Sequence, residues 1–288
     1  MKYIIYLIFN IFYQPSIIFL SPNKNIMSTF SFSSNSDFPP KSSYIQNIAV
    51  VLINSANLIS ATNDAKNLPK LYVDKLNFSH VYMLFDNDST LNQTKSTLTS
   101  YTNITYAAPQ SKNDLLLILL DILNNLENTY CVLHISSHGY CSGFDNNYLI
   151  WNTNVLTDIE INTTFTTALN SKANTFLVVL ADACQTGTIC NLNYKTLDLI
   201  NYESENNTAQ NTNIICISAV SDQQYDPDDI SDLGFDGGLT SGLIDYFYEL
   251  YDNKPTIGDF FKYYTNRIGP LGLNSILSFN LKSFIEKN

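Results

Sequence analysis

The sequence predicts an α/β fold with a mainly parallel sheet and helices on both faces. Apolar runs of strand length alternate with stretches of helical length from residue 47 almost to the C-terminus. Most of these runs are continuously apolar, as expected for strands that are buried on both faces. Polar motifs containing glycine follow two of the runs directly, and parallel sheets bind their ligands at the carboxyl ends of their strands.

The predicted strands are short runs rich in Ile, Val, Leu and aromatic residues, which favour extended backbone. In chain order they cover residues 48–53, 80–85, 130–135, 175–181, 214–219 and 275–279. Parallel neighbours need a crossover connection, and the intervening stretches are long enough to supply helices. We therefore expect a mostly parallel six-stranded sheet.

The helices are predicted between these strands. Asn63 is a candidate N-cap for a helix that continues through Leu68. Apolar residues then recur at helical length in four later stretches, namely 114–126, 158–169, 240–251 and 256–267. Two helices are thus expected before the two motifs and three between or after them.

The chain divides into three parts. Residues 1–26 are apolar but interrupted by polar residues and Pro15, which fits a signal peptide, a membrane anchor, or a misassigned start before Met27. Residues 27–46 form a linker rich in Ser and Asn, and residues 47–288 form one domain. The protein is expected to be cytoplasmic if translation starts at Met27. It is expected to be secretory or membrane-anchored, through this segment alone, if residues 1–26 are retained.

The composition excludes some classes of function. With 15 Lys and Arg against 26 Asp and Glu, the formal net charge is −11, so nucleic acid is not expected as a partner. The five cysteines are odd in number and share no repeated spacing, which argues against a disulfide framework. No CxxC pair or histidine cluster has the spacing of a zinc site, so no metal site of that kind is expected.

Two motifs carry the chemistry. Ser136-Ser137-His138-Gly139 and Asp182-Ala183-Cys184-Gln185-Thr186-Gly187 each follow a predicted buried strand. A thiol acts as a nucleophile when a nearby imidazole generates the thiolate, and glycine lets backbone N–H groups approach a developing oxyanion. Asp182 lies two residues before Cys184 and should face the same side of the strand. His134 lies deeper in its apolar run and is expected to be a core histidine.

At these residues the chain resembles the caspase/metacaspase clan of cysteine peptidases, on the metacaspase side. The two motifs look like the Ser-Gly-His-Gly and Asp-x-Cys-x-x-Gly motifs of metacaspases. Three further segments also match in order, and the resemblance covers Asn47 to Phe279. The segments are Asn63–Leu68, Ile217–Gln223 and Gly237–Ser241.

The resemblance implies a three-layer caspase-like sandwich and a cysteine endopeptidase. His138 would be the base and Cys184 the nucleophile, with the backbone N–H groups of Gly139 and Cys184 as the oxyanion hole. Asp182 and Ser136 would line a pocket for Arg or Lys before the scissile bond. Ser218 and Asp222 would add substrate contacts.

The resemblance also implies partners and cofactors. The substrates would be polypeptides with basic residues, and the protein would be a monomer. Metacaspases usually have a second acidic group near the end of the first strand, where this sequence reads Asn54-Ser55-Ala56-Asn57. We expect no cofactor or metal. Calcium is left open, because the region after His138 offers Asp145, Asp158 and Glu160 without paired aspartates.

Self-processing is predicted at Lys195. The stretch between Cys184 and the fifth strand is polar and loop-like, and from Asn191 to Asn213 its only basic residue is Lys195. An enzyme that cleaves after basic residues would therefore cut itself there.

Two other readings stay open. A peptidase resembling legumain or the glycosylphosphatidylinositol transamidase shares the His-Gly and Cys features and would suit a secretory N-terminus. A catalytically inactive caspase-like module would serve in binding or regulation. Cleavage after Asn would favour the first, and failure of a thiol-directed probe to label Cys184 would favour the second.

Overall fold

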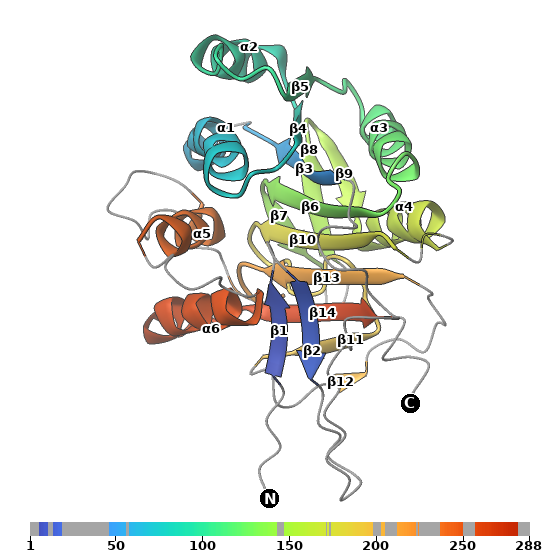
Figure 1. Ribbon diagram of the computed structural model, residues 1–288, viewed down its shortest axis with the longest axis vertical. Helices are drawn as coiled ribbons and strands as arrows, with labels where there is room; N and C mark the ends of the chain where they lie inside the picture. The colour runs from blue at the N-terminus through green and yellow to red at the C-terminus, as the bar shows by residue number, and fades with distance from the viewer. Residues whose placement is uncertain are drawn as a thin grey trace, which may run out of the picture.

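The computed structural model describes most of the chain after residue 45. The described residues are 6–10, 14–18, 46–55, 58–142, 147–170, 172, 174–197, 203–204, 212–222, 224, 237–249 and 257–281. Within them, the strands form a nine-stranded sheet, a three-stranded sheet and a two-stranded hairpin. Helices cover both faces of the large sheet, so the architecture has three layers (Figure 1).

The large sheet has nine strands rather than the six that the sequence predicts, in the order β12-β11-β14-β13-β10-β6-β3-β4-β5. Six strands are mutually parallel: β3 (Gln46–Ile53), β4 (His80–Phe85), β5 (Ile104–Ala107), β6 (Thr129–Ser136), β10 (Phe176–Asp182) and β13 (Asn213–Ser218). Three are antiparallel to their neighbours: β14 (Ile276–Leu281), β11 (Tyr194–Thr196) and β12 (Glu203–Ser204). The strands that the sequence missed, β5, β11 and β12, are all short, so they lack an apolar run of predictable length.

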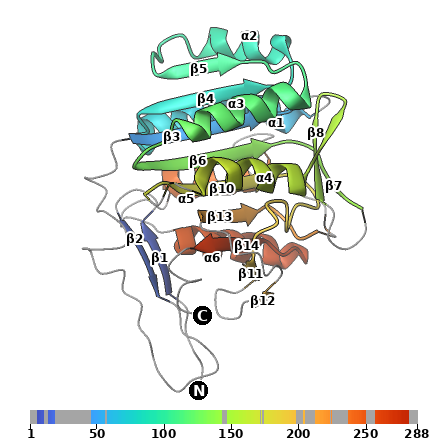
Figure 2. The same cartoon turned by 90° about the vertical axis from the view of Figure 1, so that its right-hand side faces the viewer.

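The helices divide between the two faces of the sheet (Figures 1 and 2). On one face lie α1 (Ile59–Lys70), its one-turn π-helical extension η2 (Leu71–Lys75), α5 (Gly238–Glu249) and α6 (Ile257–Ile268), which is followed by the 3₁₀ turn η3 (Gly269–Leu271). On the other face lie α3 (Lys112–Asn124) and α4 (Asp158–Leu169), while α2 (Asp88–Thr97) lies beside β4 and β5 at the edge of the sheet. The sequence did not predict α2, whose residues are mostly polar.

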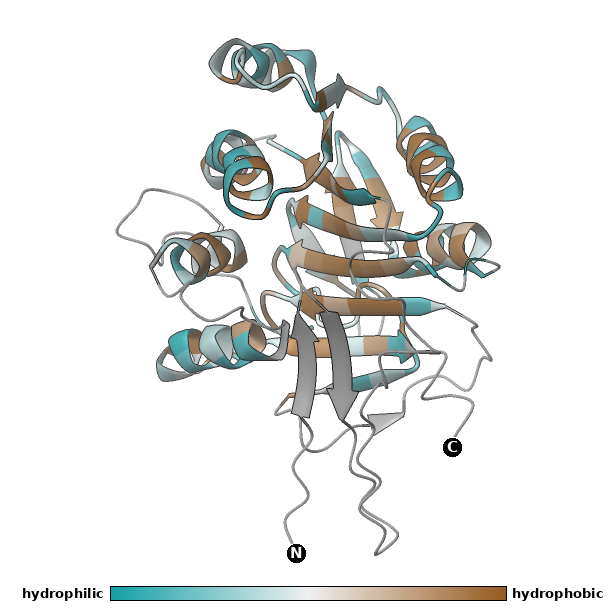
Figure 3. Ribbon diagram, viewed as in Figure 1, coloured by the Kyte–Doolittle hydropathy of each residue, from teal (hydrophilic) through white to brown (hydrophobic). Residues whose placement is uncertain are grey.

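Alternation along each central strand builds two cores. In β3, Ala49, Val51 and Ile53 pack with the helices α1, α5 and α6. The intervening residues of β3 pack with α3 and α4 instead. Because both sets are apolar, the central strands are coloured as hydrophobic over most of their length in Figure 3. This two-sided burial accounts for the continuous apolar runs in the sequence.

Helix α1 begins earlier than the sequence indicates. It starts at Ile59 with Leu58 as its N-cap, so Asn63 lies inside the helix and does not cap it. Ala61, Ala65 and Leu68 are fully buried and recur at helical spacing, which explains why the helix extends back to include Ala61. As a result Asp64 lies on the buried side of α1.

A small antiparallel sheet follows β6 directly. It consists of β7 (Gly139–Cys141), β8 (Asn147–Trp151) and β9 (Asn154–Thr157), with β8 in the middle. It stands at the carboxyl end of β6 and leads into α4 (Figure 2). The chain after His138 therefore enters a sheet and not an open loop.

The N-terminal segment is described only in part. The strands β1 (Tyr6–Asn10) and β2 (Gln14–Ile18) form an antiparallel pair. The rest of the predicted signal or anchor segment, and the linker up to residue 45, lie outside the described residues. In the part of the chain that the structure describes, no helix has both the length and the apolar character needed to span a membrane.

Candidate active site

His138 and Cys184 each follow one of two neighbouring parallel strands, at equivalent positions in the register. Strands β6 and β10 pair in register, with Ser136 opposite Asp182 at their last residues. His138 and Cys184 each come two residues later, and both are partly exposed after strands that are buried throughout. The structure thus brings the predicted base and the predicted nucleophile to one edge of the sheet.

Gly139 is where the two motifs touch. A Cβ atom at this position would lie 2.1 Å from the carbonyl oxygen of Cys184 and 2.8 Å from the Thr186 side chain. Any residue other than glycine would therefore push the turn after Cys184 away from the histidine strand. The glycine of the first motif is required by this close approach of two backbones.

The backbone of the histidine segment is held by the small sheet. The Ile150 N–H donates to the His138 carbonyl at 3.0 Å. The Ser137 hydroxyl and the Asn54 amide both donate to the Ile150 carbonyl. Asn54 directly follows β3, so at this position an amide braces the histidine segment where the resemblance implies an acidic group.

The turn after Cys184 is held by side chains from outside it. Ser218, at the end of β13, is fully buried and donates its hydroxyl to the carbonyls of Thr186 (2.6 Å) and Gly187 (3.2 Å). Asp222 accepts from the Thr188 N–H (2.8 Å) and the Thr188 hydroxyl (3.1 Å). Burial raises the pKa of Asp222, and the bonds from Thr188 oppose that rise. These contacts place Ser218 and Asp222 beneath the nucleophile turn, and their contact with substrate stays a prediction.

Two buried carboxylates lie on one side of the strand ends. Asp182 accepts from the N–H groups of Leu239 (3.3 Å) and Thr240 (2.7 Å) in the first turn of α5. Asp64 accepts from the Ser136 hydroxyl at 2.6 Å and from the Gly237 N–H at 3.2 Å. The positive end of α5 and these N–H donors stabilise the negative charges. We call Asp64, Ser136 and Asp182 the acidic cluster.

Asp64 is a site residue that the sequence analysis missed. It comes from α1 and is fully buried, and with Asp182 it supplies the second carboxylate that the region Asn54–Asn57 lacks. A signal for it was present: Asp64 lies three residues after Ala61 and four before Leu68, on the apolar stripe of the helix. An acidic residue on such a stripe needs polar partners, which here are Ser136 and Gly237.

His134 is a buried histidine with both ring nitrogens engaged. Its Nδ1 lies 3.0 Å from the Tyr72 hydroxyl, and its Nε2 lies 2.8 Å from the Thr240 hydroxyl. Burial lowers its pKa to about 4, although the nearby Asp182 charge acts in the opposite direction. The prediction of a core histidine is confirmed, and this residue ties β6 to the first turn of α5, where Thr240 also contacts Asp182.

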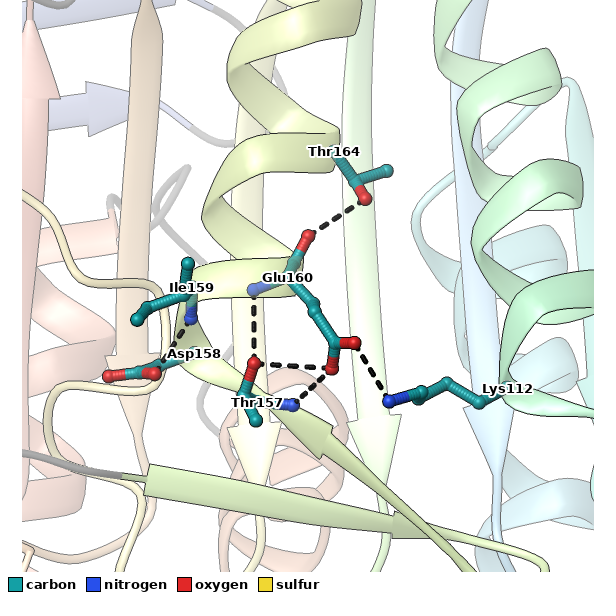
Figure 4. Close-up of polar contacts among 6 residues, drawn as sticks. All are labelled: Lys112, Thr157, Asp158, Ile159, Glu160 and Thr164. Carbon is teal, nitrogen blue, oxygen red and sulfur yellow. Dashed lines mark hydrogen bonds and ion pairs between the residues drawn. The ribbon is translucent and has the colours of Figure 1, made fainter.

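The acidic residues considered for calcium have other partners. Glu160 forms a capping box with Thr157 and an ion pair with Lys112 at 2.7 Å, and Asp158 accepts from the Ile159 N–H at 2.7 Å (Figure 4). These contacts lower the pKa of Glu160 despite its burial. Asp145 lies outside the described residues. Among the described residues, no group of three or more His, Cys, Asp or Glu side chains could hold a metal ion.

Lys195 lies in a strand and not in the loop that the sequence indicated. It is the middle residue of β11 and pairs with Ser278 of β14 on one side and with Glu203 of β12 on the other. A protease binds its substrate as an extended segment, so this bond becomes accessible only when β11 leaves the sheet. The predicted self-processing position is therefore protected in the folded chain.

Comparisons with known proteins give the fold. No protein-family model and no curated protein matches the sequence. Caspase-1 from Spodoptera frugiperda matches in structure, with a TM-score of 0.51 at 9% identity over 85% of this chain and 90% of the caspase.

Two other structures are similar. Pro-Sf-caspase-1 has a TM-score of 0.47 at 8% sequence identity, and the match covers 92% of this chain and 95% of that one. Raptor from Chaetomium thermophilum has a TM-score of 0.38 at 10% sequence identity, and the match covers 75% of this chain and 20% of Raptor. The match to caspase-1 shows that this chain has a caspase-like α/β fold, so the predicted fold class is confirmed.

Proposed function

We propose that this protein is a cysteine endopeptidase that cleaves polypeptides after Lys or Arg. One observation carries the proposal: neighbouring parallel strands deliver His138-Gly139 and Cys184 to the same edge, where the two backbones touch. The caspase-like fold is a scaffold on which such a pair acts in other proteins, and fold alone does not fix activity. The residues at the site are what support the function.

The chemistry follows from the two side chains. His138 takes the proton of the Cys184 thiol, and the thiolate sulfur attacks the carbonyl carbon of the scissile bond. The backbone N–H groups of Gly139 and Cys184 stabilise the oxyanion of the tetrahedral intermediate. His138 then gives the proton to the leaving amine, which leaves an acyl-enzyme on Cys184. Water, deprotonated by His138, hydrolyses the acyl-enzyme.

The acidic cluster supports a preference for basic residues. Asp182 lies two residues before the nucleophile, and Asp64 supplies a second carboxylate on the same side of the sheet. An ammonium or guanidinium group that enters a buried site needs compensating charge, and two carboxylates compensate it better than one. Asp, the residue that caspases prefer, would be repelled by the same charges. These charges support the proposal that this protein lies on the metacaspase side of the clan.

A panel of fluorogenic peptides that differ only in the residue before the cut tests this proposal. We expect hydrolysis after Lys and Arg, weak hydrolysis after Asn and Asp, and none with Cys184→Ala. Running the panel with and without calcium settles the cofactor, and we expect equal rates in the two conditions. Preferred cleavage after Asn would replace the proposal with the legumain-like alternative, and no cleavage of any peptide would favour a non-enzymatic module.

A further inference from the structure

Gln185, the residue after the nucleophile, has an unusual backbone. Its φ is +52°, in the left-handed region that residues with a Cβ seldom adopt. Such conformations persist where the surrounding structure holds them, and they are frequent at functional sites. Contacts on two sides of Gln185 do this here.

The side chain of Gln185 reaches the histidine segment. Its Oε1 accepts a hydrogen bond from the backbone N–H of Cys141 at 3.1 Å. Cys141 ends β7, which begins at Gly139 directly after His138. The amide therefore connects the turn that carries the nucleophile to β7, the strand that directly follows the base. The backbone of Gly139 also lies close to the Cys184 carbonyl, so the two segments approach each other at a second place.

The backbone of Gln185 is fixed from the opposite direction. Its N–H donates to the carbonyl of Gln224 at 2.9 Å. The side chain of Gln224 in turn donates to the Gly272 carbonyl (2.9 Å) and accepts from the Asn274 N–H (2.8 Å). Gln185 thus stands between β7, which follows His138, and the segment that leads into β14.

Gln185 is hydrogen-bonded on two sides, which limits how far the turn after Cys184 can move. The pairing of β6 with β10 ends at Ser136 and Asp182, with one further bond from the Ser137 N–H to the Asp182 carbonyl at 3.3 Å, so His138 and Cys184 lie beyond the paired residues. A base and a nucleophile must keep hydrogen-bonding distance, and small displacements of reacting groups cost large factors in rate. The Gln185 amide is placed to limit such displacement.

We propose that Gln185 is a positioning residue that holds the Cys184 turn against β7, so that the His138 imidazole stays beside the Cys184 thiol. The inference rests on the proposed function, because it assigns the pair its catalytic roles. Gln185 acts through the backbone of Cys141 and does not need to touch the substrate.

Two variants separate positioning from other roles. Gln185→Met has similar length but no acceptor, so the bond to Cys141 is lost. Gln185→Glu keeps an acceptor oxygen at the same place. Gln93 is an exposed glutamine on α2, distant in sequence from Gln185, so Gln93→Met is the matched control for replacing a glutamine by methionine.

The first readout is peptide hydrolysis. We expect Gln185→Met to lower kcat by about 10²-fold with KM within about twofold of wild type, since a misplaced base costs rate and not binding. Gln185→Glu should recover most of kcat at alkaline pH, because its charge raises the pKa of the thiol without removing the hydrogen bond. A wild-type kcat in Gln185→Met overturns the proposal. So does a loss of kcat that Gln185→Glu fails to recover.

The second readout does not need peptidase activity. The rate at which iodoacetamide alkylates Cys184, followed by peptide mass spectrometry across pH, reports how strongly the imidazole stabilises the thiolate. We expect slower alkylation near neutral pH in Gln185→Met, with an unchanged unfolding temperature. If wild type cleaves no peptide, this difference still supports positioning while the proposed function fails. Identical alkylation profiles in the two proteins overturn the positioning role.

Discussion

The acidic cluster and the turn after Cys184 lie next to each other and are built in opposite ways. Asp64, Ser136 and Asp182 come from regular elements, α1, β6 and β10, and are almost completely buried. The turn from Cys184 to Cys190 has no regular structure of its own. It is held by a hydrogen bond that the Ser218 hydroxyl donates, by bonds that Asp222 accepts from Thr188 and, we propose, through the Gln185 amide.

We propose that this difference separates substrate recognition from catalysis. The carboxylates of the buried cluster can move only if the helices and strands around them move as well. A cluster held in this way suits a fixed preference for one kind of substrate side chain. The turn can shift by small amounts when one hydrogen bond is lost, so its supports should govern rate. Substitutions in the cluster are expected to change which peptide is cut, and substitutions around the turn to change how fast.

The largest effect is expected at the pair itself. Cys184→Ala and His138→Ala should each lower kcat by about 10⁴-fold or more, because neither nucleophile nor base can be replaced by water at the same place. His80→Asn, at the start of β4 and so at the opposite edge of the sheet, two strands away from β6, is the control and should keep full activity. Steady-state hydrolysis of a Lys peptide measures this. Activity retained in Cys184→Ala would move the chemistry elsewhere.

The next effect is expected in the cluster. Asp64→Asn and Asp182→Asn should each lower kcat/KM for Lys peptides by about 10²-fold, since the incoming cation loses one of its two compensating charges. The rate for a peptide with a neutral residue at that position should change little. Asp121→Asn, on the exposed side of α3, is the control. An equal loss for both peptides would assign the cluster to stability and not to specificity.

Acid should destabilise the fold through His134. Its pKa is about 4 in the folded protein and about 6.5 when unfolded. Between these values the unfolded chain binds more protons, so the free energy of unfolding falls as pH drops from about 7 to 4. The contribution is roughly 3 kcal/mol at most.

Denaturant unfolding at several pH values measures this, with His134→Gln beside wild type. Removing the titrating group should flatten the acid dependence, so the gap in stability between the two proteins narrows as pH falls. The stability of His80→Asn should depend on pH as that of wild type does over most of the range from pH 7 to 4. A constant gap from pH 7 to 4 would mean that His134 binds its proton at the same pH in both states.

The smallest effect is expected at Ser218. Ser218→Ala leaves the Thr186 and Gly187 carbonyls without its hydroxyl, which should cost about 1–2 kcal/mol of stability and about tenfold in kcat, with KM unchanged. Ser278→Ala on the adjacent strand is a matched control, because the Ser278 hydroxyl has no hydrogen-bond partner among the described residues. If both variants lose kcat equally, the support of the turn is not specific to Ser218.

The proposed catalytic pair could be found from the sequence more readily than the proposed recognition site. His138 and Cys184 follow short apolar runs whose length and composition favour buried strands, so their meeting at one edge could be predicted. Asp64 could not be assigned from a strand end, because it reaches the site across the sheet face from α1. The assumed start of that helix at Asn63 also concealed its buried side.

Short elements account for the remaining misses. The strands β11 and β12 contain three and two residues, too few for a pattern to develop. For this reason the sequence predicts a loop at Lys195, whereas the residue lies in β11, between β12 and β14. Contacts such as Gln185 to Cys141 join residues 44 positions apart, and local sequence carries no sign of them.

Covalent labelling tests most directly whether Cys184 is the nucleophile and whether the site beside it selects basic residues. The protein is incubated with two peptidyl ketone probes that react with thiols and differ only in Lys or Asp at the position before the reactive group. Peptide mass spectrometry then locates the adduct. We expect the Lys probe to modify Cys184 at least tenfold faster than the Asp probe, and not to modify His138→Ala at a comparable rate. Modification of another cysteine, or equal rates for the two probes, would contradict the claim.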